Sequence, residues 1–367
     1  MGLTFLNAGE SHGKELTAII QGLPANMPVN VDKINEELKK RQGGPGRGGR
    51  MAIEEDKVEI TSGVRHAKTL GSPITLKVVN RDNGNWGFIM SPDFVEEEYR
   101  EARQVVEPRP GHADLVGAIK YGHTDMRNIL ERSSARETAS RVAIGALVRQ
   151  LVEATGVELE HKVIQVGEIV TANATDEEIV KYIEETKEKG DTLGGIIELR
   201  IKNVVPTLGS YISWDSKLDA KIAQAVISIN AFKAVEFGDG FEVGKRLGSQ
   251  VMDEIEHNAE KGFTRKTNHL GGFEGGMTNG EDIIIRAAMK PIPTLMQPLD
   301  TVNLYTKEKV KASTERSDVT AIFAAGVVLE NVVATTLAQS YLDKFSSDNF
   351  ADFMRDVRET KKLIKEF

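Results

Sequence analysis

Two histidines of this sequence lie in settings that suit proton transfer. His12 stands between small residues in the motif Gly9–Gly13, and His112 follows an arginine in the motif Arg109–Asp114. An imidazole can give or take a proton near neutral pH, and neighbouring glycines let a ligand come close to it. A lone histidine is more often structural, so neither motif by itself predicts catalysis.

The region from 38 to 53 holds the densest group of cations. It contains five basic residues and no acidic one, and five of the seven residues 43–49 are glycine. Guanidinium groups bind carboxylate or phosphate through paired hydrogen bonds, and a glycine backbone can approach a ligand closely. The segment therefore predicts either an anion-binding loop built on Arg41, Arg47 and Arg50 or a solvated loop without such a role.

Polar and basic side chains also gather between residues 109 and 136. The group consists of Arg109, His112, Arg132, Ser133, Ser134 and Arg136. Prolines at 108 and 110 predict a stiff irregular loop around the first two of these residues. Ser134 and Glu137 match a capping box before an apolar run to about Ala154, which predicts a helix start. The first N–H groups of a helix lack intrahelical partners, so an anion is favoured there.

Two further groups lie near the carboxyl end of the sequence. Lys290–Thr294 places an ammonium group on a turn fixed by two prolines, and Glu315–Asp318 places Arg316 and Asp318 at the start of a predicted helix. For Asp318 alone, a carboxylate that complements the helix dipole is the simpler interpretation. The chain has no HExxH, HxH or carboxylate-rich loop, so the sequence predicts no metal site.

Three nucleotide-binding patterns are matched only in part. Glycines 44, 46 and 49 have the spacing of the dinucleotide fingerprint, but they follow a predicted helix where the fingerprint requires a strand. Gly9–Lys14 is one residue short of a phosphate-binding loop, and Glu15 stands where a hydroxyl is needed. Arg47 begins a single RGG triplet without neighbouring aromatic residues. Because the net charge is −8, we expect no nucleic-acid partner.

Composition is that of an ordinary folded protein. Of the 367 residues, 40% are hydrophobic and 28% are charged. The absence of cysteine excludes disulfides, thiolate nucleophiles and thiolate-bound metal. The longest apolar stretch, residues 319–329, is shorter than the roughly 20 residues that span a bilayer and predicts a buried helix. We expect a cytoplasmic protein without membrane contact.

Capping residues and periodicity outline the elements that must position these motifs. Helices are predicted at 31–41 after Asn30, at 134–154, after a capping box at Thr175 and Glu178, and at 215–229, 317–343 and 348–366. Strands are predicted at 74–80, 196–203 and 282–289. No linker or charge block divides this mixture of α and β elements, so we expect a single domain over residues 1–367.

Taken together, the motifs closely resemble those of the chorismate synthase family, from Thr4 to about Ala338. The family's elements GESHG, RRQGG-x-GRG-x-R-M, RPGHAD, RSSARET, DS-x-GG, EGGM-[TS]-NG, KPIPT and ERSD appear here, in the family's order, at 9–13, 40–51, 109–114, 132–138, 191–195, 274–280, 290–294 and 315–318. Two departures are visible. Pro45 stands where an aromatic residue is common, and Thr192 replaces the usual serine.

The resemblance implies a lyase of the shikimate pathway of aromatic amino-acid biosynthesis. In the implied reaction, 5-enolpyruvylshikimate 3-phosphate loses phosphate and a proton by 1,4-elimination and gives chorismate. Reduced FMN is required although there is no net redox change. The implied fold is of the α+β class, a single-domain β-α-β sandwich with a helical layer between two antiparallel sheets, assembled as a homotetramer.

The resemblance also implies roles for individual residues. His12 would donate a proton to the departing phosphate, His112 would stabilise the reduced flavin, and Asp318 would manage the proton of flavin N5. The substrate-binding positions would be Arg41, Arg47, Arg50, Arg109 and Arg136. The FMN-binding positions would be Arg132, Ser133, Ser134, Asn230, Ala231, Gly275, Lys290, Pro291, Ile292, Pro293, Thr294 and Arg316.

Two other functions and one question about the flavin stay open at this point. A non-catalytic RNA-binding protein would use the loop around Arg47, and its affinity would fall steeply with salt. A flavin oxidoreductase would consume NAD(P)H steadily without releasing phosphate. Arg41 and Arg47 match positions associated with NADP in the family, but the same arginines would serve substrate phosphate. The sequence therefore does not decide between NADPH as the direct reductant and a separate flavin reductase.

Overall fold

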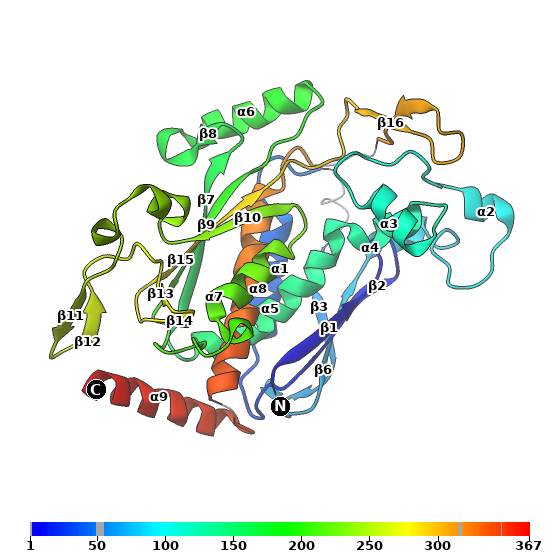
Figure 1. Cartoon of the computed structure of the whole chain (residues 1–367). Coiled ribbons are helices and arrows are strands. Elements are labelled where there is room, and N and C mark those ends of the chain that lie inside the picture. The colour runs from blue at the N-terminus through cyan, green and yellow to red at the C-terminus, as the bar shows by residue number, and fades with distance from the viewer. Residues whose placement is uncertain (1, 49–54, 315–317, 346) are drawn as a thin grey trace.

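The computed structural model describes residues 2–48, 55–314, 318–345 and 347–367, and its fold is of the α+β class with antiparallel sheets. Its α-helices are α1 (Val31–Gln42), α2 (Glu97–Glu101), α3 (Asp114–Tyr121), α4 (Arg127–Ser133), α5 (Thr138–Glu153), α6 (Asp176–Glu188), α7 (Leu218–Ile227), α8 (Ile322–Lys344) and α9 (Phe350–Glu366) (Figure 1). Short 3₁₀ helices are η2 (Arg81–Asn85), η3 (Ala135–Glu137), η4 (Thr171–Asn173), η5 (Trp214–Ser216), η6 (Gly240–Lys245) and η7 (Gly248–Gln250).

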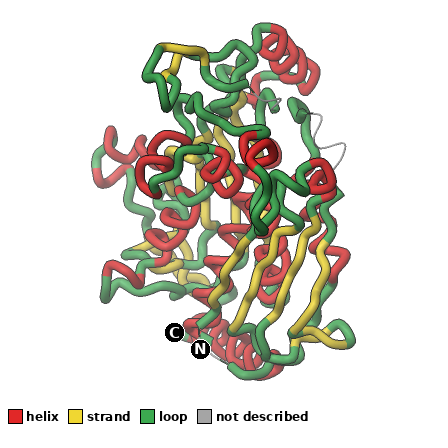
Figure 2. The backbone as a smooth tube through the Cα atoms, turned by 90° about the vertical axis from the view of Figure 1, so that its right-hand side faces the viewer, coloured by secondary structure: helices red, strands yellow, loops and turns green. Residues whose placement is uncertain are grey.

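The first sheet is antiparallel and carries a clear alternation of buried and accessible residues. Its strands are, in spatial order, β1 (Thr4–Ala8), β2 (Glu15–Gln21), β6 (Ile74–Val79) and β3 (Val58–Ser62) (Figure 2). Along β2, Leu16, Ala18 and Ile20 are buried, whereas Thr17 and Ile19 between them are more accessible. One face of this sheet therefore contributes to the core and the other faces outward.

The second sheet is also antiparallel. Its strands are, in spatial order, β10 (Phe232–Phe237), β15 (Ile283–Met289), β9 (Gly195–Lys202), β7 (Glu158–Val166) and β8 (Ile169–Val170). The remaining strands form two-stranded hairpins: β4 (Val64–Arg65) with β5 (Lys68–Thr69), β11 (Ile255–Asn258) with β12 (Gly262–Arg265), β13 (Phe273–Glu274) with β14 (Met277–Thr278), and β16 (Asp300–Val302) with β17 (Lys309–Lys311).

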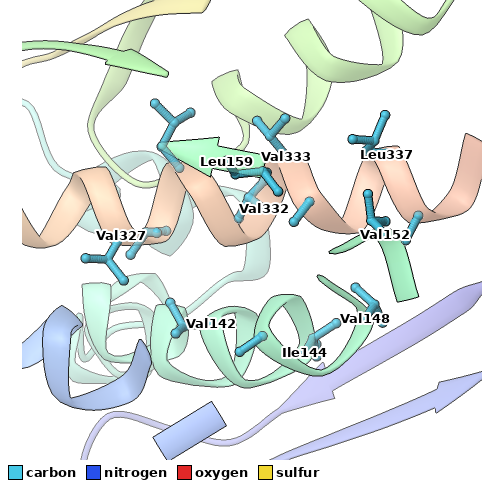
Figure 3. Packing of buried hydrophobic residues seen from close by; sticks show 14 of the residues in the cluster. Val142, Ile144, Val148, Val152, Leu159, Val327, Val332, Val333 and Leu337 are labelled. Atoms are coloured by element: carbon cyan, nitrogen blue, oxygen red, sulfur yellow. The ribbon is translucent and has the colours of Figure 1, made fainter. Parts of the chain in front are cut away.

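Helices α5 and α8 connect the two sheets through the core. Helix α5 contacts β2 and β6 of the first sheet, α8 contacts β7 and β9 of the second, and the two helices pack against each other. Figure 3 shows the aliphatic residues of α5, α8 and β7 at this contact, among them Val148 and Val333. A Cβ at Gly145 would lie 2.3 Å from the carbonyl oxygen of Asn331, so the close approach of the helices requires glycine there.

Helix α8 is long and apolar enough to pass a composition test for a membrane span, but it lies in the protein core. In its most apolar window 89% of the residues are buried. Strands β7 and β9 and helix α5 pack against it, so its apolar side chains are buried by protein and not by lipid. The buried helix expected from residues 319–329 is confirmed, although it begins at Ile322 and extends to Lys344.

Most elements expected from the sequence are present. Asn30 caps α1 through its side chain, and Thr175 and Glu178 form the capping box of α6. The strands predicted at 74–80, 196–203 and 282–289 correspond to β6, β9 and β15. The segment predicted as one helix at 215–229 contains the end of η5 and then the α-helix α7, which is shorter than predicted.

The capping box predicted at Ser134 and Glu137 is wrong. The Ser134 hydroxyl accepts from the backbone N–H of Arg136 and begins the 3₁₀ helix η3, and α5 starts only at Thr138. The carboxylate of Glu137 accepts instead from the side chain of Asn7 in β1, at 3.1 Å. A tertiary hydrogen bond has therefore replaced the local one.

Candidate active site

His12 lies on the turn that joins β1 to β2, against the end of α4. Its Nδ1 lies 2.8 Å from Glu131 Oε1, and its backbone N–H donates to Glu131 Oε2 at 2.8 Å. Ser11 donates its backbone N–H to the Glu131 carbonyl and its hydroxyl to Ser134 Oγ. These bonds hold the turn on α4, and only 13% of the His12 side chain is exposed.

Trp86 packs on His12, which sequence analysis did not anticipate. The two rings are stacked with centroids 3.8 Å apart and an interplanar angle of 21°. The guanidinium carbon of Arg103 lies 4.0 Å from the centroid of the Trp86 ring. A single tryptophan in an irregular polar segment has no periodicity that would mark it, so only the tertiary structure shows this contact.

His112 and Arg109 share the buried carboxylate of Asp114 at the start of α3. Arg109 donates to Asp114 Oδ2 from both its backbone N–H and its Nε, at 3.0 Å each, and His112 Nδ1 is hydrogen-bonded to Oδ1. Burial alone would raise the pKa of Asp114, but the hydrogen bonds from His112 and Arg109 outweigh it and lower that pKa well below its usual range. Asp114 is therefore ionised, which keeps a proton on His112 Nδ1.

The predicted cofactor positions after α7 and β15 join the His12 region. The side-chain N–H of Asn230 donates to the Ser133 carbonyl at 3.0 Å, and the backbone N–H of Lys290 donates to the Ala231 carbonyl at 2.9 Å. Ala231 has a φ of +69°, a conformation that non-glycine residues rarely adopt and that often marks functional sites. Burial, with a smaller effect of Lys233, lowers the pKa of the Lys290 ammonium.

Ser133, Asn230, Ala231 and the segment Lys290–Thr294 form a strip of contacting residues. This strip continues to the His112 region. Thr294 Oγ1 accepts from Arg109 Nη1 at 2.9 Å, and a Cβ at Gly111 would lie 4.0 Å from Pro293. Thr192, one of the two departures from the family pattern, donates its hydroxyl to the Ile292 carbonyl at 2.8 Å. A serine could make the same bond, so this departure keeps the contact.

The glycine–arginine loop reaches the segment before α8. Arg47 Nη1 lies 2.6 Å from Asp318 Oδ2, and the backbone N–H of Val319 donates to the Gly46 carbonyl at 2.8 Å. Gly46 has a φ of +80°, and a Cβ there would lie 2.8 Å from Thr320 Cγ2, so the loop needs glycine at this position. Asp318 precedes α8 by four residues. The expectation of a first-turn carboxylate is therefore wrong.

Arg41 and Arg136 are buried beside one shared carboxylate. Arg136 Nη1 binds Asp56 Oδ1 at 2.7 Å, and Arg41 Nη1 lies 3.3 Å from Asp56 Oδ2. Arg136 Nε donates to Asn80 Oδ1 at 2.7 Å. Burial is the main cause that lowers the pKa of Arg41, to about 10. The Asp56 carboxylate opposes this shift, and the Arg136 guanidinium adds to it. Two guanidinium groups with one common carboxylate leave a surplus of positive charge next to the His12 turn.

Three predicted residues are not placed in this assembly. Arg50 and Arg316 lie outside the described residues. Gly275 lies in the turn of the β13–β14 hairpin, where its neighbours are Tyr211 and Met277, and Figure 1 shows this hairpin away from α3 and α4. In the part of the chain that the structure describes, no group of three or more His, Asp or Glu residues could hold a metal ion.

Arg132 and Ser133 also differ from expectation. They form the last turn of α4, whereas the sequence pattern predicted that they precede a helix start. Arg132 donates to the carbonyls of Gly9 and Asn7, at 3.1 and 3.0 Å, and so ties α4 to the end of β1. The predicted anion site of this region therefore has arginine side chains and not a long helix N-terminus.

Comparison with known proteins decides which family this arrangement belongs to. A sequence model described as chorismate synthase matches residues 3–342. Proteins named chorismate synthase from Lactococcus lactis and Streptococcus sanguinis are each 54% identical, with full coverage of both chains. A solved structure titled "Crystal Structure of Chorismate Synthase" is 39% identical and superposes with a TM-score of 0.80, covering 100% of this chain and 99% of the other.

The chain belongs to the chorismate synthase family. Membership identifies it as an enzyme, a carbon–oxygen lyase of aromatic amino-acid biosynthesis. One observation in the structure fits the flavin that chorismate synthases use: the side-chain oxygen of Asn230 is buried and has no hydrogen-bond partner in the structure. A buried orphan acceptor is costly, so a ligand that donates to it would be stabilised. The strained Ala231 and the partly buried Lys290 lie next to it in the same strip.

Proposed function

We propose that this chain converts 5-enolpyruvylshikimate 3-phosphate into chorismate and phosphate, with reduced FMN as its cofactor. The observation that carries the proposal is the continuous strip of contacts from His12 through Ser133, Asn230 and Lys290 to Arg109 and His112. These contacts link residues that are far apart in the sequence. Full-length similarity to chorismate synthases supports the same assignment.

The charges of the strip suit the proposed ligands. The substrate carries two carboxylates and a phosphate, and FMN carries another phosphate, so the site must neutralise several anions. Arg109 and Arg47 would bind substrate anions directly. The buried pair Arg41 and Arg136 would add positive electrostatic potential without contacting the substrate. Such interactions are stronger away from bulk water. Arg50 and Arg316 complete the set of proposed anion ligands.

In the proposed reaction, the allylic C–O bond to phosphate and one C–H bond break, and a new double bond forms. His12 would protonate the departing phosphate as a general acid. His112, whose Nδ1 proton is held by Asp114, would stabilise negative charge on the bound reduced cofactor. When bound, reduced FMN would supply electron density transiently and recover it, so that no net oxidation occurs. Asp318, paired with Arg47, would accept or return a proton beside it.

The flavin would be held by the strip between Ser133 and Thr294. The side-chain oxygen of Asn230 would accept a hydrogen bond from the flavin, and Lys290 would supply an ammonium group. Pro291, Ile292 and Pro293 would form a conformationally restricted segment beside the ring. Arg132 and Ser134 lie at the end of α4 beside it. Gly275 is proposed as a cofactor contact on family resemblance alone, because its hairpin is not part of this strip.

The decisive experiment is an anaerobic assay with photoreduced FMN and the substrate. We expect equal amounts of phosphate and chorismate, and no product with oxidised FMN. His12→Ala should lose turnover, whereas His257→Ala, which changes an exposed histidine on β11, should not. Release of neither product by the wild-type protein would refute the proposal. Steady NADPH consumption without phosphate would indicate a flavin oxidoreductase.

We also propose the assembly and setting that the family implies. The chain would form a homotetramer of single-domain subunits, each with helices layered between the two sheets, and would act in the cytoplasm. The contacts of α5 with the first sheet and of α8 with the second support the layering. Sedimentation equilibrium would test the tetramer. Aerobic NADPH oxidation with FMN would show whether the chain reduces its own flavin or depends on a separate reductase.

A further inference from the structure

We propose that Glu131 and Trp86 are positioning residues for His12: Glu131 selects the tautomer of the imidazole, and Trp86 fixes the plane of its ring. This inference rests on the proposed role of His12 as a proton donor. The family motifs do not include Trp86, and Glu131 immediately precedes the RSSARET motif.

The first observation is that both carboxylate oxygens of Glu131 bind the same residue. Oε2 accepts the backbone N–H of His12 and Oε1 faces its Nδ1, each at 2.8 Å. The Glu131 side chain is only 3% exposed, so water does not compete for these contacts. An ionised carboxylate can only accept hydrogen bonds, and Nδ1 must therefore carry its proton. Nε2 is left as the nitrogen that exchanges a proton with a ligand.

The second observation is that the indole of Trp86 is enclosed by stacking groups. His12 lies over the indole with centroids 3.8 Å apart, and the Arg103 guanidinium lies 4.0 Å from the same ring. Arg127 lies 5.2 Å from the ring as well. Each cation is attracted to the π face, which holds the indole in place.

The backbone around Arg103 supports a specific role for this stack. Arg103 has a φ of +62°, in the left-handed region that is unfavourable for a non-glycine residue. Such strain persists only when surrounding contacts compensate for it. Arg103 makes two such contacts: its guanidinium lies on the indole of Trp86, and its carbonyl accepts a hydrogen bond from Arg127 Nε. The backbone conformation at Arg103 therefore places its guanidinium on the indole that stacks on His12.

Tautomer and ring plane matter because an imidazole that turns about its Cβ–Cγ bond exchanges the positions of its ring atoms. Nε2 now lies 3.9 Å from Asp82 Oδ2, beyond hydrogen-bond distance. A ring that rotated or swapped tautomers would present the wrong atom to the leaving group. Misplacement of a catalytic group by about 1 Å can cost on the order of 100-fold in rate.

The kinetic test is a double-mutant cycle with His12. In Glu131→Gln, the amide offers one acceptor where His12 needs two, and in Trp86→Leu the flat surface is lost. We expect each variant to lower kcat by roughly 10- to 100-fold with little change in KM. In a His12→Ala background, neither change should lower kcat further, and Trp86→Phe should retain more activity than Trp86→Leu. Equal losses in both backgrounds would overturn the inference, because a purely structural role does not depend on His12.

A spectroscopic test needs no ligand or turnover. ¹⁵N NMR of histidine-labelled protein distinguishes Nδ1–H from Nε2–H imidazoles. We expect neutral His12 in the wild-type protein to be the Nδ1–H form and Glu131→Gln to populate the other tautomer. The matched control is Asp239→Asn, which alters the corresponding pair with His269 and should leave the His12 signals unchanged. An unchanged His12 tautomer in Glu131→Gln would overturn the inference even if the lyase assignment is correct.

Discussion

The His12 and His112 regions use the same contact in two different ways. In each, an imidazole Nδ1 faces a carboxylate with little or no exposure, Glu131 for His12 and Asp114 for His112. Glu131 gives both of its oxygens to His12, and its nearest cation, Arg127, is 3.7 Å away. Asp114 instead divides its oxygens between His112 and Arg109.

The two carboxylates therefore have different main roles: Glu131 orients the His12 ring, and Asp114 balances the charge of Arg109. Both oxygens of Glu131 hydrogen-bond to His12, and its ion pair with Arg127 is longer, so its removal should alter mainly the position of His12. Asp114 balances a buried guanidinium as well as an imidazole, so its removal should leave Arg109 without a counter-ion. The first carboxylate is therefore expected to matter more for rate, and the second more for stability.

The largest effect is expected from removal of the imidazoles themselves. His12→Ala should lower kcat by about 100- to 10,000-fold, the range that general acids contribute. His112→Ala should lower turnover by a smaller factor, because its proposed role is to stabilise the reduced cofactor and not to protonate the leaving group. Circular dichroism should show that both variants fold. Unchanged anaerobic chorismate formation in either variant would remove the role assigned to that histidine.

The next effect tests stability at Asp114. Asp114→Asn breaks a buried ion pair while leaving Arg109 charged, which typically costs about 3 kcal/mol or more of the free energy of unfolding. Glu131→Gln should cost only about 1 kcal/mol, because mainly hydrogen bonds are lost. Urea denaturation with both variants provides the comparison. Equal destabilisation would show that the two carboxylates do not differ as described.

A pH titration sharpens the same point. The pKa of Asp114 is lowered in the folded protein, so its stabilising contribution is complete above the unfolded pKa of about 4. Below that pH the unfolded chain binds a proton that the folded chain does not, and the contribution declines. The difference in unfolding free energy between wild type and Asp114→Asn should therefore shrink from pH 6 to pH 3. A difference that stays constant over this range would contradict the assignment.

The sequence predicted local elements better than it predicted the site. Asn30 and Thr175 cap their helices as expected, because capping depends on residues two or three positions away. Ser134 also caps a helix start, that of η3, but the predicted capping box with Glu137 is wrong. The Glu137 carboxylate binds the side chain of Asn7, more than a hundred residues away. Local patterns are reliable only where no tertiary partner competes.

The chemical motifs were found, but several of their partners were not. The sequence did not single out Asp56, because it is one of three consecutive acidic residues, 54–56, and nothing in their spacing marks which one is buried. It is nevertheless the shared counter-ion of Arg41 and Arg136. Trp86 gave no pattern at all. These residues owe their roles to contacts between distant segments, and one sequence contains no record of such contacts.

The smallest expected effect concerns Thr192, which lies in the strip that links the two histidine regions. Its hydroxyl donates to the Ile292 carbonyl at 2.8 Å and is largely buried. Thr192→Ser keeps this donor and should change stability by less than about 1 kcal/mol, whereas Thr192→Ala should cost about 1 kcal/mol by removing the hydrogen bond to the part-buried Ile292 carbonyl. If the proposed flavin strip depends on this bond, Thr192→Ala should also weaken FMN binding in equilibrium dialysis, and Thr192→Ser should not. Equal FMN affinity in both variants would confine Thr192 to a structural role and leave the strip to Asn230 and Lys290.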